Sequence, residues 1–226
     1  MNGELMKVSS YRKDLIRAIM ERDPAARSAI EVRLLYPGYK AIMAHCRAHW
    51  CFNHNLKFLA RWISEHAKRK TGIEIHPAAK IGRGVCIDHG MGVVIGETAE
   101  VGDGCTIYQG VTLGGTGKDV GKRHPTIGNN VLIGSGAKVL GPFTVGDNAR
   151  IAAGAVVLSE VPANATAVGV PARVVRVAGQ IPACDLDQIH YADPVSQDIC
   201  RLEQEIIRLQ KKLDMGGMEN TDGGGI

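Results

Sequence analysis

Residues 127–157 read IGNNVLIGSGAKVLGPFTVGDNARIAAGAVV, and a small aliphatic side chain stands at every sixth position of this stretch. These positions are Ile127, Ile133, Val139, Val145, Ile151 and Val157. A hexapeptide forms one short strand and one corner, so three hexapeptides, about eighteen residues, close one triangular coil with every sixth side chain pointing inward. The stretch therefore predicts a left-handed parallel β-helix, a solenoid of stacked coils.

The same period is present upstream in two further runs. They are Ile75, Ile81, Ile87 and then Ile95, Val101, Ile107, Leu113. Glycine often follows the aliphatic residue, as in Ile81-Gly82 and Ile127-Gly128, which suits corners where a Cβ atom would crowd the turn. A scaffold without chemistry of its own is the alternative interpretation, but ionisable residues stand where the period breaks.

The period slips at two places, and both slips are interpreted as loops. The spacing from Ile87 to Ile95 is eight residues instead of six, and the extra residues fall within the sequence DHGMG. The spacing from Leu113 to Ile127 is fourteen residues, and the intervening segment is glycine-rich and cationic. Each insertion carries a histidine beside a charged residue, so these loops are the candidate sites.

The composition limits the class of protein. With 226 residues and 45% hydrophobic content, the chain forms one domain with a helical cap or two small domains. The net charge of +4 is mild and spread along the chain, which favours small anionic ligands over nucleic acid. No segment approaches the roughly eighteen apolar residues of a membrane span, and the N-terminus lacks the apolar core of an export signal. A soluble cytoplasmic protein is expected.

The cysteines show neither CxxC spacing nor a zinc-binding pattern, so reduced thiols and no metal site are expected. They are Cys46, Cys51, Cys86, Cys105, Cys184 and Cys200. Cys86 and Cys105 directly precede or lie near inward-facing positions of the repeat, which favours a structural role over one as an acyl carrier.

The predicted fold class is α+β, with five segments along the chain. An N-terminal α-helical domain spans 1–71, and the left-handed parallel β-helix of hexapeptide repeats spans 72–177. A proline-containing linker spans 178–194, a C-terminal coiled-coil helix 195–215, and a polar, flexible tail 216–226. The last strand of the solenoid is expected to end near 169–173.

Within the helical region, Asp23-Pro24 predicts a helix start with Asp23 as N-cap, and Tyr36-Pro37 predicts a break between helices. In the C-terminal helix, apolar residues alternate spacings of three and four, as in a coiled coil; they are Ile199, Leu202, Ile206, Leu209 and Leu213. Because so short a coiled coil is marginal alone, it is expected to pair with copies of itself on an assembled oligomer. A single helix packed on its own subunit is the alternative.

His89 is the natural general base of the first insertion, because histidine titrates near neutral pH. Glu74 precedes it by fifteen residues, close to one coil, so stacking at about 4.8 Å is expected to bring the carboxylate to the imidazole. Such a contact fixes the tautomer and stabilises the imidazolium. Spacing alone leaves a solvated corner histidine as an equal alternative.

Four stretches of the sequence carry a resemblance to a known family. They are EIHPAAKIG at 74–82, IDHGMGVVIGET at 87–98, and VTLGGTGK at 111–118 followed by KRHP at 122–125. Together they resemble serine acetyltransferase, over roughly Asp23 to Arg173. The resemblance implies transfer of acetyl from acetyl-CoA to the hydroxyl of L-serine, giving O-acetylserine for cysteine biosynthesis, by direct attack without an acyl-enzyme. Acetyl-CoA is then a co-substrate, and no cofactor is permanently bound.

The resemblance also implies roles for individual residues. His89 removes the hydroxyl proton of serine, and Glu74 orients His89, although many family members have Asp at this position. Asp23 and Asp88 bind the amino group of serine, whereas Arg123 and His124 bind its carboxylate and hydroxyl, which gives each charge of the amino acid a counter-charge.

Other interpretations of these residues stay open at this stage. Asp23 is also an ordinary helix cap, Arg123 a solvated loop charge, and His124 an alternative base, while His76 is best explained as a corner residue before a proline. The resemblance further implies that the pantetheine arm of CoA is bound by Gly115, Thr116, Ser135 and Ala153. The family has Ala at the position of Ser135, and a main-chain contact would tolerate that change. Lys118, Lys122 and Lys138 are candidates for the phosphates of CoA.

The family also implies partners. A homotrimer with sites between neighbouring solenoids is expected. Many family members pair into a dimer of trimers through N-terminal helices, but the region before Asp23 is short for that. The tail ending in Ile226 resembles the family's tail that inserts into O-acetylserine sulfhydrylase. Feedback inhibition by cysteine is implied because cysteine differs from serine by one atom.

Three other functions compete with this interpretation. A zinc carbonic anhydrase on the same scaffold needs three histidine ligands, which His76, His89 and His124 are able to supply. An acyltransferase acting on a sugar or an antibiotic is a second rival. A non-enzymatic regulatory partner of the sulfhydrylase is the third.

Overall fold

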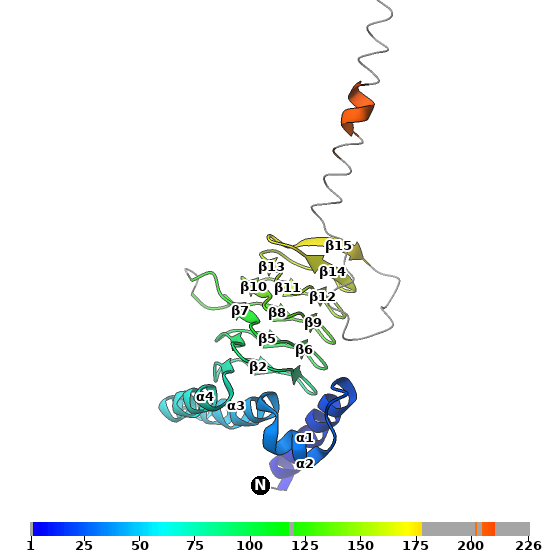
Figure 1. Ribbon diagram of the computed structural model, residues 1–226. Coiled ribbons are helices and arrows are strands. Elements are labelled where there is room, and N and C mark those ends of the chain that lie inside the picture. The colour runs from blue at the N-terminus through cyan, green and yellow to red at the C-terminus, as the bar shows by residue number, and fades with distance from the viewer. Residues whose placement is uncertain (1, 118–119, 178–201, 203–204, 211–226) are drawn as a thin grey trace, which may run out of the picture. The chain divides into compact units, whose positions relative to one another are not determined.

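The computed structural model describes residues 2–117, 120–177, 202 and 205–210 (Figure 1). The chain divides into two compact units, Met1–Tyr191 and Ala192–Ile226. The first unit holds four helices followed by the solenoid, so the helical region and the solenoid that the sequence separates at residue 72 pack as one body. In the second unit, Leu202 and residues 205–210 are helical. The rest of the predicted linker, coiled coil and tail lies outside the described residues.

The predicted β-helix is confirmed. Its short strands stack into three sheets, with the orders β1-β4-β7-β10-β13, β11-β8-β5-β2 and β15-β14-β12-β9-β6-β3. The first sheet contains β1 (Glu74–Ile75), β4 (Val94–Ile95), β7 (Thr112–Gly114), β10 (Lys138–Leu140) and β13 (Val156–Val157). The second contains β2 (Lys80–Ile81), β5 (Glu100–Val101), β8 (Thr126–Ile127) and β11 (Thr144–Val145). The third contains β3 (Cys86–Ile87), β6 (Thr106–Ile107), β9 (Leu132–Ile133), β12 (Arg150–Ile151), β14 (Ala165–Val168) and β15 (Arg173–Val177).

The register of the first sheet records both insertions. Leu113 pairs with Ile95 and Val139 pairs with Val157, each eighteen residues apart, which is one regular coil. Ile75 instead pairs with Ile95, and this separation exceeds one coil by two residues. Leu113 pairs with Val139, and this separation exceeds one coil by eight residues. The two period slips are therefore loops that leave the coil and return without disturbing its stacking.

The repeat positions form the core, as predicted. Ile133, Val139, Val145 and Ile151 are all 0% exposed. The glycines that follow the aliphatic residues are needed for close approach between coils. A Cβ atom built on Gly102 would lie 2.6 Å from the carbonyl oxygen of Gly128, in the next coil.

Four helices precede the solenoid: α1 (Asn2–Arg22), α2 (Ala29–Leu35), α3 (Pro37–Asn53) and α4 (Lys57–Thr71). The break at Tyr36-Pro37 is confirmed, but the predicted helix start at Asp23-Pro24 is wrong. Helix α2 begins at Ala29, because the side chain of Ser28 is the N-cap and accepts a hydrogen bond from the backbone N–H of Glu31. No helix in the described part of the chain combines the length and apolar character that crossing a membrane requires.

The helices are fastened to the first coils by side chains that bind corner carbonyls. Arg22 donates to the carbonyl oxygens of Gly84 at 2.8 Å and Gly104 at 2.9 Å, and Tyr11 donates to that of Gly82 at 3.0 Å. At the other end of the solenoid, β14 and β15 form an antiparallel hairpin around the cis Val170-Pro171 peptide bond. The last strand was expected to end near this point, but the chain turns there and adds one more strand.

Candidate active site

The first insertion places His89 at a corner between β3 and β4. Its backbone is left-handed, with φ 56°, and the carboxylate of Asp88 accepts a hydrogen bond from its backbone N–H at 2.9 Å. The imidazole is 72% exposed, and its Nε2 lies 4.0 Å from Oδ2 of Asp88. A non-glycine residue in this conformation is uncommon and is held here by its neighbour's side chain. The strained turn presents an accessible imidazole beside one carboxylate.

The charges of Asp23 and Asp88 both act on Tyr36, although the sequence places the two carboxylates far apart. The hydroxyl of Tyr36 donates to Oδ2 of Asp23 at 2.6 Å, and the backbone N–H of Ala25 donates to Oδ1 at 2.8 Å. The hydrogen bond to Asp23 raises the pKa of Tyr36 to about 12, with further contributions from burial and from the charges of Asp23, Glu31 and Asp88. Asp23 thus closes a turn after α1 and does not cap a helix. No motif in the sequence pointed to the role of Tyr36.

The structure does not bring Glu74 to His89. The register pairs Glu74 with Val94, and its carboxylate is bound by Lys68 at 2.5 Å and lies 3.8 Å from Arg61. The hydrogen bond to Glu74 raises the pKa of Lys68. The expected stacking fails within one chain because a separation of fifteen residues is less than one coil.

The second insertion returns to the coil at Arg123 and His124, at the corner between the first and second sheets. Nη2 of Arg123 donates to Oε2 of Glu97 at 2.8 Å. His124 is 7% exposed, and its Nδ1 lies 3.2 Å from the backbone N–H and 2.9 Å from the hydroxyl of Thr98. Burial, followed by the charge of Arg123, lowers the pKa of His124, which favours the neutral imidazole.

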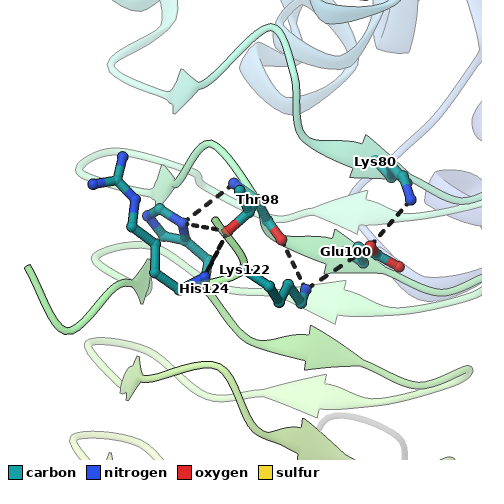
Figure 2. Close-up of polar contacts among 6 residues, drawn as sticks. Lys80, Thr98, Glu100, Lys122 and His124 are labelled. Atoms are coloured by element: carbon teal, nitrogen blue, oxygen red, sulfur yellow. Dashed lines mark hydrogen bonds and ion pairs between the residues drawn. The ribbon is translucent and has the colours of Figure 1, made fainter. Parts of the chain in front are cut away.

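The carbonyl oxygen of Thr98 also binds a side chain of the returning loop (Figure 2). The amino group of Lys122 donates to its carbonyl oxygen at 2.8 Å and lies 3.9 Å from Glu100, which in turn pairs with Lys80 at 3.1 Å. Glu97 and Thr98 stand in one of the stretches that carry the family resemblance, but sequence reasoning assigned them no role.

The four residues predicted to bind CoA divide between two corners. Ser135 and Ala153 stand at the corner between the third and first sheets, and the backbone N–H of Gly154 donates to the carbonyl oxygen of Ser135 at 2.8 Å. Gly115 and Thr116 follow β7 at the opposite edge of the first sheet. A Cβ on Gly115 would lie 3.3 Å from Nε2 of His124, so this glycine lies against the imidazole.

Of the lysines considered for phosphates, Lys138 donates to the carbonyl oxygen of Gly110, and Lys122 binds Thr98 as described above. Lys118 lies outside the described residues. The ammonium groups of Lys122 and Lys138 thus both donate hydrogen bonds to backbone carbonyl oxygens of the protein.

The candidate residues form two clusters on opposite edges of the first sheet. The first cluster, defined by Asp23, Asp88 and His89, precedes β4; the second, defined by Arg123 and His124, follows β7. No hydrogen bond or ion pair within the described ranges joins the clusters. His76 and Glu74 belong with the second, because the charges of Glu97, Arg123 and Glu74 all act on the imidazole of His76, whose pKa is lowered mainly by burial.

The buried thiols are poor nucleophiles. Burial raises the pKa of Cys86 to about 12 and that of Cys105 to about 11, so the thiolate is scarce at neutral pH. Within the part of the chain that the structure describes, no three His, Cys, Asp or Glu side chains are grouped so as to hold a metal ion.

The three-faced solenoid, with histidines and charged side chains in its corner loops, is that of a transferase of the hexapeptide-repeat class. The family model described as bacterial transferase hexapeptide (six repeats) matches residues 124–159. A serine acetyltransferase from Bacillus pumilus is 54% identical over 201 residues, which are 89% of this chain and 93% of that protein. One from Synechococcus elongatus is 52% identical over 198 residues, 88% of this chain and 81% of that protein. The chain belongs to the serine acetyltransferase family, a family of acyltransferase enzymes.

Solved structures of the family show the same fold with bound ligands. A Neisseria gonorrhoeae serine acetyltransferase in complex with serine superposes with a TM-score of 0.73 at 43% identity, covering 76% of this chain and 70% of that one. A serine acetyltransferase in complex with cysteine gives 0.77 at 43%, covering 80% and 71%. A Brucella abortus serine acetyltransferase in complex with coenzyme A gives 0.75 at 44%, covering 76% and 69%.

Proposed function

We propose that this protein transfers the acetyl group of acetyl-CoA to the hydroxyl of L-serine, giving O-acetylserine and CoA, with His89 as the general base. The exposed imidazole of His89, held in a left-handed turn beside Asp88, is the observation that carries the assignment of the base. A base must be accessible to the proton that it removes, and the imidazole of His89 is accessible.

The serine oxygen attacks the thioester carbon directly. His89 takes the hydroxyl proton as the new C–O bond forms, and the thiolate of CoA leaves as the tetrahedral intermediate collapses. The raised pKa values of Cys86 and Cys105 argue against an acyl-enzyme on either thiol.

The charges at the two clusters match a zwitterionic amino acid. The carboxylates of Asp23 and Asp88, which share Tyr36 as a neighbour, bind the ammonium group. Arg123 and the neutral imidazole of His124 bind the carboxylate and hydroxyl oxygens. L-Cysteine carries the same two charges, and it therefore competes for this site as a feedback inhibitor.

The separation of the clusters supports a site built from two copies of the chain, and hence a homotrimer of solenoids. Each corner supplies half of the counter-charges, so the first cluster of one protomer meets the second cluster of its neighbour. Glu74 lies with the second cluster, so a role in orienting His89 requires the imidazole of a neighbouring protomer. The pantetheine arm of CoA runs along Gly115, Thr116, Ser135 and Ala153 between the same two copies. The tail ending in Ile226, outside the described residues, is proposed to bind O-acetylserine sulfhydrylase.

The test is thiol release from acetyl-CoA with L-serine as acceptor, compared with other acceptors that include a hexosamine. We expect serine-dependent release, and a loss of about 10² to 10⁴ in kcat for His89→Ala with the oligomer intact. His66→Ala, which removes an exposed histidine stacked on Trp62 at 5.7 Å, is the matched control. Unchanged turnover in His89→Ala would refute the assignment of the base, and release with the hexosamine alone would overturn the acceptor.

A further inference from the structure

The hydroxyl of Thr98 lies at the centre of the contacts that hold the second cluster (Figure 2). The backbone N–H groups of Arg123 and His124 donate to its oxygen at 3.0 and 3.1 Å. A hydroxyl has two lone pairs and one proton, and a backbone N–H is always a donor. Both lone pairs are therefore used, and the hydroxyl proton is left to donate to Nδ1 of His124, 2.9 Å away.

Nδ1 of His124 receives a second donor as well. The backbone N–H of Thr98 points at the same nitrogen from 3.2 Å. A nitrogen that faces two donors carries a lone pair and no proton, so the neutral ring bears its proton on Nε2. Protonating Nδ1 would place its N–H against two other donors.

Nε2 of His124 lies against two residues that lack side chains. A Cβ atom would lie 2.0 Å from Nε2 if built on Gly96 and 3.3 Å if built on Gly115. None of the hydrogen bonds among the described residues uses Nε2. Within the described part of the chain, the ring therefore offers an N–H donor that has no protein acceptor, beside Arg123 at the proposed carboxylate site.

The surrounding charges leave this ring neutral. Burial and the charges of Arg123, Lys122 and His76 lower the pKa of His124, against an opposing contribution from Glu97. These are the titratable groups that face the ring from both the returning loop and the coil, and their balance favours the uncharged form.

We infer that Thr98 is a positioning residue that fixes His124 as an Nε2–H donor, so that His124 gives a hydrogen bond to a substrate oxygen and does not accept the proton. This inference rests on the proposed function, and it decides between the two histidines that the sequence left open. To act as a base, His124 would need its proton on Nδ1, where Thr98 allows none. The role of general base therefore falls to His89.

Kinetics of three variants test the role of the hydroxyl. Thr98→Val removes it, Thr98→Ser keeps it, and Thr144→Val makes the same change at an exposed threonine of β11. We expect Thr98→Val to raise KM for serine at least tenfold, the value of roughly one hydrogen bond, with KM for acetyl-CoA nearly unchanged. Thr98→Ser is expected to stay within about threefold of the native enzyme. Native KM for serine in Thr98→Val would overturn the inference.

The tautomer is measured directly by NMR of the native protein with ring-¹⁵N-labelled histidine, and His124→Gln identifies the signal. We expect a ring protonated only on Nε2 with a pKa below the usual value for histidine, and in Thr98→Val a higher pKa of the same ring. A proton on Nδ1 in the native protein would overturn the inference, whether or not serine is the acceptor. Because the spectrum needs no substrate and no folded variant at position 98, it separates a failure of this inference from a failure of the proposed function.

Discussion

Replacing Gly96 by alanine should disable the second cluster by pushing His124 aside. The backbone of Gly96 is outside the left-handed region, so alanine is acceptable there and the effect is steric. The new Cβ would lie 2.0 Å from both Nε2 and Cδ2 of His124. Ordinary contacts between such atoms are about 3.5 Å, so the ring must retreat by about 1.5 Å. That movement breaks the hydrogen bonds to Thr98 at 2.9 and 3.2 Å.

The expected cost follows from this displacement. Overpacking of a close contact destabilises by about 1 to 3 kcal/mol, which lowers Tm by roughly 2 to 12 °C for a chain of this size. A donor misplaced by about 1 Å costs on the order of 10² in kcat/KM for serine. Thermal unfolding and initial rates of thiol release measure the two quantities.

The double variant Gly96→Ala, His124→Ala provides the control. Without the imidazole, the new methyl group has room, so the loss of stability should be smaller than the sum of the two single losses. Additive losses, or a Gly96→Ala enzyme with native kcat/KM for serine, would refute the steric argument and the role given to His124.

Two further predictions concern the fold. Ile133→Ala removes a side chain that is 0% exposed and should lower the unfolding free energy by about 2 to 5 kcal/mol. Leu158→Ala, at a position that is 56% exposed, is the control and should lower it by less than about 0.5 kcal/mol. Equal losses in denaturant titrations would contradict the inward assignment of the repeat. Burial lowers the pKa of His45 to about 3, below its unfolded value of about 6.5, so the unfolded chain binds a proton that the folded chain does not. The contribution of His45 to the unfolding free energy should therefore be complete above pH 6.5 and should be lost as the pH falls toward 3. His45→Leu should reduce this dependence of the unfolding free energy on pH. An unchanged dependence would mean that other groups cause it.

The period of six residues was sufficient to predict the solenoid, because burial in so thin a core is decided by one position in each hexapeptide. Ile127 and Ile151 are 2% and 0% exposed, as the pattern requires. The same pattern predicted both loops, since coils stack only when their period is kept. Local composition was less reliable at Asp23, where Ser28 offers the better N-cap and the helix begins six residues later.

The arrangement of the site depends on the lengths of the loops. Glu74 pairs with Val94 because the first loop adds two residues to an eighteen-residue coil, so His89, fifteen residues after Glu74, falls at the preceding corner. The partners of His124 depend on where the second loop returns, which no spacing within that loop specifies. Thr98 fixes this return with four hydrogen bonds: its hydroxyl accepts two and donates one, and its backbone N–H donates one.

The two clusters divide the work of the site according to their surroundings. The imidazole of His89 is exposed on a strained turn, as the proposed base must be. His124 is enclosed by Thr98, Gly96 and Gly115, as the inferred role of a fixed donor requires. A base must change its charge during each turnover, whereas a preorganised donor must not. The regular coil separates these environments at opposite edges of one sheet, and in the proposed function two apposed copies of the chain bring them to one substrate.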